Sequence, residues 1–299
     1  MAEGKERAQS RLQNLQTIEP LISSLRVLSL STMQMAMNRQ ESLDAYAERF
    51  NEVAELVWRT VDRKKVVKVR EEAFDYRPIQ QHQVLAVIGS TRGIVGQYNK
   101  NLARLTSEHL RANPEEDIRV LAFGRRIHSV LSQEGVTFTE RGSLSTGSLP
   151  DYDAAASLIR EWDQRIEEGT LKKVSVLSYR RRNSNTIYQP RLTELLPGKL
   201  ERKETEVEDE SWLVPIVEGD PELIFGKIEG HMVAIEFYRM ILDAVAAENL
   251  FRFRLLEEAK ENTTNLLEEL SLEVQANRRR EITQQLQELL AGSGMLAQR

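Results

Sequence analysis

Several residue types are absent or scarce in the 299-residue sequence. It contains no cysteine, which excludes disulfides and thiolate chemistry within the chain and suits a reducing cytosol. Aromatic residues make up only 6% of the chain, whereas charged residues make up 29%. Few aromatic residues together with many Leu, Glu, Gln and Arg residues favour long exposed helices over a bulky globular core.

Long apolar runs and an excess of basic residues are also missing. No stretch approaches the ~20 consecutive apolar residues that a membrane-spanning helix needs. The charged segment at residues 1–10 has no apolar centre of the kind that signal peptides carry. The formal net charge is −5, which gives no reason to expect a basic surface for nucleic acid. We therefore expect no nucleic-acid partner, and membrane association only through partner proteins.

Residues suited to metal binding or acid–base catalysis do not cluster in the sequence. The four histidines are scattered and show no ligand spacing such as His-x-x-x-His. They are His82, His109, His128 and His231. We accordingly predict no catalytic residue, no metal site and no cofactor.

The N-terminal part predicts one long helix. Residues 11–72 contain no glycine and a single proline, Pro20, and their apolar residues recur at helical spacing. Leu15, Ile18, Ile22 and Leu25 step by three and four residues, which is typical of a coiled-coil seam. Because proline cannot donate a backbone hydrogen bond and clashes with the preceding turn, we expect a kink or a local break at Pro20.

The middle of the sequence alternates between short apolar runs and helical segments. Strands are predicted at 84–88, 118–123, 174–179 and 186–196, and helices at about 99–111, up to 133, and at 154–168. Strands that alternate with helices are typical of a parallel, Rossmann-like α/β domain. The acidic segment at 198–210 predicts an exposed loop or linker.

After Pro221 the helical pattern returns and continues to Ala291, where glycines end it. Its expected buried stripe is Leu255, Leu256, Ala259, Leu266, Leu267, Leu270 and Val274. Two long amphipathic helices can bury their stripes by pairing antiparallel. We therefore predict the α/β class, with a long antiparallel coiled coil of the terminal helices and an inserted Rossmann-like domain. The expected division is a coiled-coil helix at 1–75, the α/β domain with its acidic loop at 76–210, and a coiled-coil helix at 211–299.

A glycine-containing turn follows the first predicted strand. It contains Arg92, Gly93 and Gly96, and glycine turns before a helix can present backbone N–H groups to phosphate. However, the segment fits neither Gly-x-Gly-x-x-Gly nor the Lys-Ser/Thr phosphate loop. We favour a structural strand-to-helix turn over nucleotide binding, with Arg92 in a structural or inter-subunit contact.

Three segments carry a resemblance to a known family. Arg278-Arg-Arg-Glu-Ile-Thr283, with the glycine at 292, resembles a signature Arg-Gln-x-x-Ile-Thr-x-Glu that ends in glycine. Ile88-Gly-Ser-Thr-Arg-Gly-Ile-Val-Gly-Gln-Tyr-Asn99 is similar to Ser-Asp-Arg-Gly-Leu-Cys-Gly-x-Phe-Asn after a first strand. Leu195-Leu-Pro197 before the acidic loop is a weaker match. In this order the three segments resemble the gamma subunits of F-type ATP synthases.

The resemblance implies a rotating central stalk without a catalytic residue of its own. In that family the paired terminal helices form a shaft inside a ring of alpha and beta subunits, and the beta subunits carry the ATP chemistry. The α/β domain contacts the epsilon subunit and the membrane ring of c subunits. The implied location is the cytoplasmic face of the cell membrane, as a peripheral subunit of a complex that transports protons or sodium. The implied residues that face the alpha/beta ring are Arg26, Arg278, Arg279 and Thr283.

The sequence departs from the family pattern at several positions. The family's N-terminal basic run is represented here only by Arg26, and the family's Arg-Gln pair is Arg278-Arg279. Two alternatives therefore stay open. The chain could be a gamma-like regulatory or assembly protein that binds ATPase subunits without rotating, or a small α/β enzyme with helical oligomerisation arms.

Overall fold

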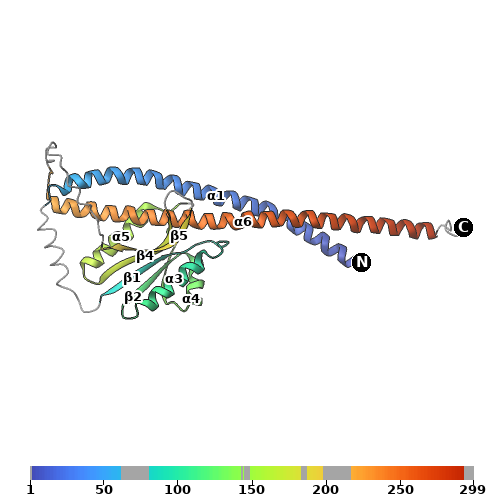
Figure 1. Ribbon diagram of the computed structural model, residues 1–299, viewed down its shortest axis with the longest axis horizontal. Coiled ribbons are helices and arrows are strands. Elements are labelled where there is room, and N and C mark those ends of the chain that lie inside the picture. The colour runs from blue at the N-terminus through green and yellow to red at the C-terminus, as the bar shows by residue number, and fades with distance from the viewer. Residues whose placement is uncertain are drawn as a thin grey trace. The chain divides into compact units, whose positions relative to one another are not determined.

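A computed structural model (Figure 1) describes residues 2–61, 81–142, 144, 149–182, 187–197 and 217–292. The elements are α1 (Ala2–Trp58), β1 (His82–Ile88), α3 (Tyr98–Ala112), β2 (Ile118–Phe123), α4 (Arg125–Gln133), β3 (Phe138–Arg141), α5 (Tyr152–Glu167), β4 (Leu171–Arg181), β5 (Tyr188–Leu196) and α6 (Pro221–Gly292). The chain divides into two compact units. One unit comprises residues 1–29 and 252–299, and the other comprises residues 30–251.

The unit of residues 30–251 is built on a five-stranded sheet with the order β3-β2-β1-β4-β5. Strand β1 pairs in parallel with β2 on one side and with β4 on the other, and β3 is parallel to β2. Strand β5 is antiparallel to β4 and forms one edge. The chain runs from β1 outward through β2 to β3 and then returns through α5 to β4 on the other side of β1, which is the doubly wound, Rossmann-like arrangement. The predicted α/β class is therefore confirmed.

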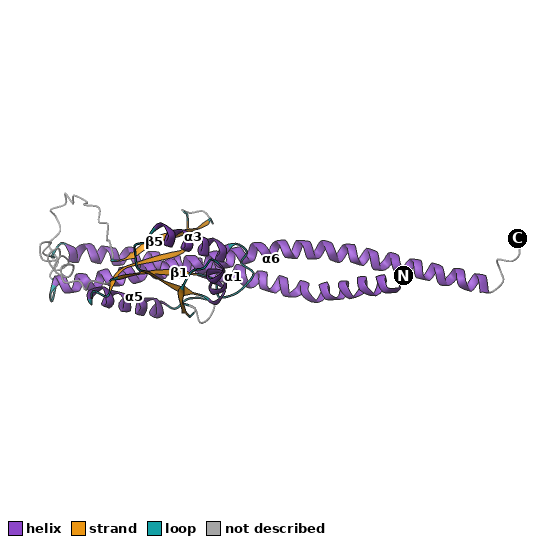
Figure 2. Ribbon diagram, turned by 90° about the horizontal axis from the view of Figure 1, so that it is seen from below, coloured by secondary structure: helices purple, strands orange, loops and turns teal. Residues whose placement is uncertain are grey.

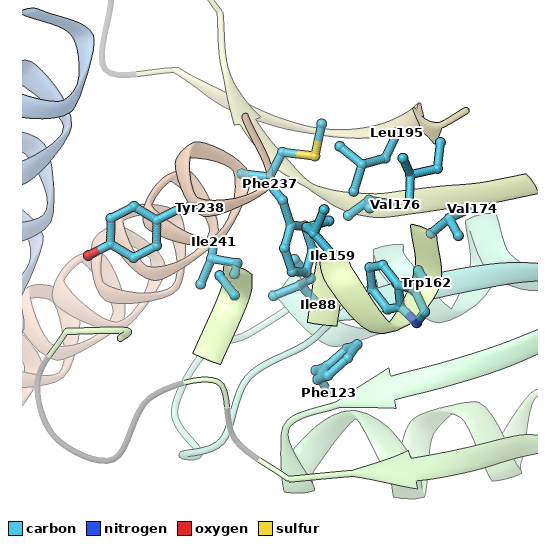
Figure 3. Close-up of a cluster of buried hydrophobic side chains, with 14 of the residues drawn as sticks. Ile88, Phe123, Ile159, Trp162, Val174, Val176, Leu195, Phe237, Tyr238 and Ile241 are labelled. Atoms are coloured by element: carbon cyan, nitrogen blue, oxygen red, sulfur yellow. The ribbon is translucent and has the colours of Figure 1, made fainter. Parts of the chain in front are cut away.

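Side chains from the two faces of the sheet enter two separate apolar clusters. All seven residues of β1 are buried, as a central parallel strand requires. Its even-numbered residues pack with Ile159 and Trp162 of α5 and with Phe237 and Ile241 of α6 (Figure 3). The odd-numbered residues pack with α3 and α4, and with residues of α1 and α6, in the second cluster. The long helices are therefore part of the core of this unit.

Within this same unit, α1 and α6 run antiparallel. Gln40 of α1 contacts Asp243 of α6, Tyr46 contacts His231, and the rings of Trp58 and Phe225 lie 4.8 Å apart. Residue numbers rise along α1 as they fall along α6, so the pairing predicted for the two helices is confirmed.

In the unit of residues 1–29 and 252–299, the same two helices lie side by side (Figure 2). The less exposed residues of α1 step by four and three, as in a coiled coil. The residues with this spacing are Ala8, Leu12, Leu15, Glu19, Ile22, Arg26 and Ser29, and Ser23 is also half-buried. The predicted seam was thus half wrong, because Ile18 and Leu25 are 45% and 42% exposed. Polar residues occupy seam positions in this stretch, so the apolar residues alone gave the wrong phase.

The helical stripe predicted for α6 is largely confirmed. Six of its seven residues are buried or half-buried, and only Leu266 is more exposed, at 46%. The less exposed positions continue as far as Asn277, and every residue from 278 to 291 is exposed. The pairing in this unit therefore stops well before the end of α6.

Of the kink or local break expected at Pro20, the local break was wrong, since α1 continues through Pro20 without interruption, and the kink stays a prediction. The expected end of α1 at residue 72 was also wrong within the described part of the chain. The helix ends at Trp58, where Thr60 and Val61 form shorter-range backbone bonds to Val57 and Trp58. The Thr60 hydroxyl also donates to the Val57 carbonyl over 2.7 Å. These local bonds replace the helical pattern.

We expect Pro20→Ala to stabilise the paired helices of this unit. Proline in a helix interior costs about 3 kcal/mol relative to alanine, because it removes one backbone bond and clashes with the preceding turn. Pro20 is exposed, so the substitution loses little packing. Hydrogen exchange of the neighbouring amides should slow at least about tenfold. Thr17→Ala, also exposed and one turn earlier, is the control and should change exchange far less. Equal exchange in both variants would contradict the expectation.

The four predicted strands and the helices between them are present, with bounds shifted by a few residues. Strand β3 was not predicted, because its four residues Phe138–Arg141 contain a single apolar side chain. The predicted loop at 198–210 lies outside the described residues. The same is true of both predicted domain boundaries, at 75/76 and 210/211, so this division of the chain stays a prediction.

Candidate subunit-binding surfaces

The turn after β1 is fixed by its own polar side chains. The Asn99 side chain accepts a hydrogen bond from the Ser90 backbone N–H over 3.0 Å and donates to the Ser90 hydroxyl over 2.7 Å. That hydroxyl donates in turn to the carbonyl of Arg92 over 3.0 Å. Gly96 has φ +52° and Ile94 has φ +60°, in the left-handed region that glycine adopts at no steric cost. These bonds hold the turn in one conformation, and the structural role expected of Arg92, Gly93 and Gly96 stays a prediction.

The crevice beside this turn is filled by the protein itself. In doubly wound folds, ligands bind at the carboxyl ends of the strands, where the strand order reverses. Here the Tyr98 hydroxyl lies 3.4 Å from the carbonyl of Ile88 and 3.3 Å from that of Ala244 in α6. Among the described residues, the cavity left at this place measures about 50 Å³. Small-molecule sites usually measure about 300–1,000 Å³, so a nucleotide does not fit.

Neither a metal centre nor a membrane span is found in the described part of the chain. No group of three or more His, Asp or Glu side chains is arranged to hold a metal ion there. Within the same residues, no helix has the length and apolarity needed to cross a bilayer.

Arg26 is held between the two helices of its unit. Its Nη1 atom lies 2.7 Å from Oε2 of Glu257, and its guanidinium carbon lies 5.9 Å from the centre of the Phe253 ring. The side chain of Arg26 is 26% exposed and that of Glu257 is 51% exposed. Arg26 thus forms an ion pair that joins α1 to α6, and its ring-facing role stays a prediction.

Arg278, Arg279 and Thr283 lie on the exposed end of α6. Neither arginine forms an ion pair with another described residue, and the Thr283 hydroxyl donates to the carbonyl of Arg279 over 2.9 Å. The two guanidinium groups are therefore available to a partner, whereas the Thr283 hydroxyl is engaged within its own helix.

An apolar surface accompanies the two arginines and was missed by the sequence reasoning. We call it the terminal face, and it consists of Leu272, Ile282, Leu286, Leu289 and Leu290. These side chains are 46–68% exposed. At 3.6 residues per turn they share one side of α6 with Arg278 and Arg279, whereas Arg280, Glu281, Gln284 and Glu288 lie opposite. The steps of four and three from 282 to 286 to 289 were the signal that could have revealed it.

Comparison with known proteins identifies the family. The model of the ATP synthase family matches residues 5–296. The chain belongs to this family. The ATP synthase gamma chain of Syntrophobacter fumaroxidans is 27% identical over 280 residues, covering 92% of this chain and 93% of the relative. The ATP synthase gamma chain of Moorella thermoacetica is 24% identical, with 96% of each chain covered. The predicted resemblance to gamma subunits is confirmed.

Solved structures show the same fold in other members of the family. A chain of the Euglena gracilis mitochondrial ATP synthase, OSCP/F1/c-ring, gives a TM-score of 0.62 at 11% identity and covers 99% of this chain and 95% of its own. A chain of the Tetrahymena thermophila mitochondrial ATP synthase central stalk/c-ring gives 0.52 at 16% identity, covering 80% and 99%. As an ATP synthase gamma family member, the chain is part of an enzyme complex. These matches give no support to the regulatory or assembly alternative.

Proposed function

We propose that this gamma family chain is the non-catalytic, rotating central-stalk subunit of an ion-transporting ATP synthase. The proposed partners are the alpha and beta subunits around the paired helices, and the epsilon subunit and the c-ring at the α/β domain. The proposed location is the cytoplasmic face of the cell membrane, reached through these partners. The observation that carries the proposal is the exposed end of α6, where an apolar surface and two arginines extend beyond the helix pairing.

The terminal face has the composition of a binding surface. Exposed apolar side chains gathered on one side of a helix indicate a protein interaction site, and burying them in a ring would be favourable. Arg278 and Arg279 could pair bidentately with carboxylates of the ring, because guanidinium presents a planar fork of donors. Arg26 would add a further positive group, oriented by Glu257.

Rotation would work through unequal contacts. An asymmetric shaft inside a pseudo-threefold ring touches each beta subunit differently, so each orientation favours a different conformation of each nucleotide site. Turning the shaft then exchanges these conformations among the sites. No residue of the shaft needs to touch ATP, which agrees with the filled crevice beside β1.

The first test is co-expression of the full chain with its cognate alpha and beta subunits. We expect a purified complex that contains this chain and hydrolyses ATP. If no ATP-hydrolysing complex that contains this chain forms, the proposal loses its main support.

Within that complex, Arg278→Ala together with Arg279→Ala should lower turnover or coupling about tenfold, since a lost charged hydrogen bond costs ~1.5–3 kcal/mol. The control is Arg280→Ala, which removes one positive charge from the opposite side of α6 and should leave the rate within about twofold. Steady-state ATP hydrolysis and ATP-driven ion pumping measure both effects. Equal rates in all variants would remove Arg278 and Arg279 from the binding surface.

A further inference from the structure

Asp243 of α6 is the centre of a buried polar network in the unit of residues 30–251. The residue is only 2% exposed. Its Oδ1 atom accepts a hydrogen bond from Gln40 Nε2 of α1 over 3.1 Å, and its Oδ2 atom lies 3.2 Å from Nε of Arg180 in β4. The backbone of Arg181 also forms a hydrogen bond to this carboxyl group. One side chain therefore connects three elements that are far apart in the sequence.

A second layer of charges surrounds this centre. Arg180 also pairs with Glu236 of α6 over 2.8 Å. Glu236 pairs with Arg239 over 3.2 Å, and Arg239 pairs with Asp44 of α1. Hydrogen bonds and ion pairs thus link α1, α6 and β4 twice, once through Asp243 and once through Arg180 and Arg239.

Stability alone does not account for this network. Burial raises the pKa of Asp243, although Arg180 and the Gln40 hydrogen bond act in the opposite direction. In addition, Gln40 Oε1 and Arg180 Nη1 are buried without a hydrogen-bond partner among the described residues. Well-packed apolar side chains of similar volume are often as stable as a buried ion pair. What directional bonds add is a fixed register, because a slip between the elements leaves charges buried and unpaired.

We infer that Asp243, with Arg180 and Gln40, is a positioning residue that locks β4 to both long helices, so that torque does not dissipate as slip between them. The inference rests on the proposed rotation. The apolar clusters around the sheet contain no directional bonds, whereas Asp243 binds Gln40 and Arg180 at 3.1–3.2 Å. The network therefore sets the stiffness of the contact between β4 and the two long helices.

The test is the angular fluctuation of a probe attached to the α/β domain of the chain in an assembled, nucleotide-stalled complex. Asp243→Asn keeps the size of the side chain and removes its charge. We expect about a twofold larger angular variance, because the link to Arg180 weakens, with ATP hydrolysis by the complex unchanged. The control is Glu108→Gln, which removes a charge of the exposed pair with Arg104 within α3. Its variance should equal that of the unmodified chain.

The outcomes separate the two proposals. If the unmodified chain forms no ATP-hydrolysing complex, the proposed function fails. If that complex forms and Asp243→Asn shows the control variance, the positioning role is overturned while the rotor proposal stands. If the Asp243→Asn chain does not assemble, the angular variance of Gln40→Met is measured instead. This substitution removes the hydrogen bond from Gln40 to Asp243 and leaves every charge in place. A broader variance in that variant supports the inference, and an unchanged variance overturns it.

Discussion

Gly89→Ala is expected to destabilise the α/β domain by at least about 3 kcal/mol. A Cβ atom at this position would lie 2.3 Å from Cβ of Ile127, and Ile127 is completely buried, so its side chain cannot swing away. Helix α4 would have to move from the end of β1. That movement strains the backbone bonds from Gly89 to Phe123 and from Arg126 to Ser90, which are 2.9 and 3.0 Å long. Urea unfolding of the full chain, followed by circular dichroism, measures the loss.

Gly93→Ala is the matched control for this prediction. A Cβ atom at Gly93 would meet only the Arg126 side chain, at 3.9 Å, so stability should stay within about 0.5 kcal/mol. The two glycines lie in the same turn but differ in the space around them. Equal effects of the two substitutions would contradict the packing described for Gly89.

Trp162→Ala is expected to cost about 3–5 kcal/mol, the usual range for removing a buried aromatic side chain. Trp162 of α5 is completely buried, and its ring centre lies 5.4 Å from that of Phe237 in α6, in an edge-to-face arrangement (Figure 3). The resulting cavity would loosen the contact between α5 and α6 within the unit. Thermal and urea unfolding of the variant measure the cost.

Trp162→Phe should be far milder, at about 1.5 kcal/mol or less. Phenylalanine keeps an aromatic ring against Phe237. It also removes the indole N–H, which is buried without a hydrogen-bond partner in the described part of the chain, and burying such a group costs ~1–3 kcal/mol. If the phenylalanine variant were as unstable as the alanine variant, the indole N–H would have a partner that this account does not include.

Much of the fold could be predicted because local pattern and tertiary structure agree. The apolar run at 118–123 has the bounds of β2, and the long stretch without glycine or proline ends close to the end of α6. Prediction failed where tertiary packing and local side-chain contacts, rather than the apolar pattern, determine the structure. The seam of α1 passes through Glu19 and Arg26, whose polar side chains hide its phase. At the end of α1 the Thr60 hydroxyl donates to the Val57 carbonyl, a local contact that no periodicity reveals.

The proposed binding and positioning residues were predictable to a smaller extent. Arg278, Arg279 and Thr283 were found only through the family resemblance, since an arginine-rich stretch by itself is usually a solvated helix face. The apolar residues of the terminal face have a helical spacing, so this surface could have been predicted from the sequence. The network of Gln40, Arg180 and Asp243 could not, because its members are more than 60 residues apart and only the fold brings them together.

The most direct test of the central claim is rotation itself. A probe on the α/β domain of this chain should turn in one direction, stepwise, when ATP is added to an immobilised complex with alpha and beta subunits. Hydrolysis of ATP by that complex while the probe stays still would contradict the account.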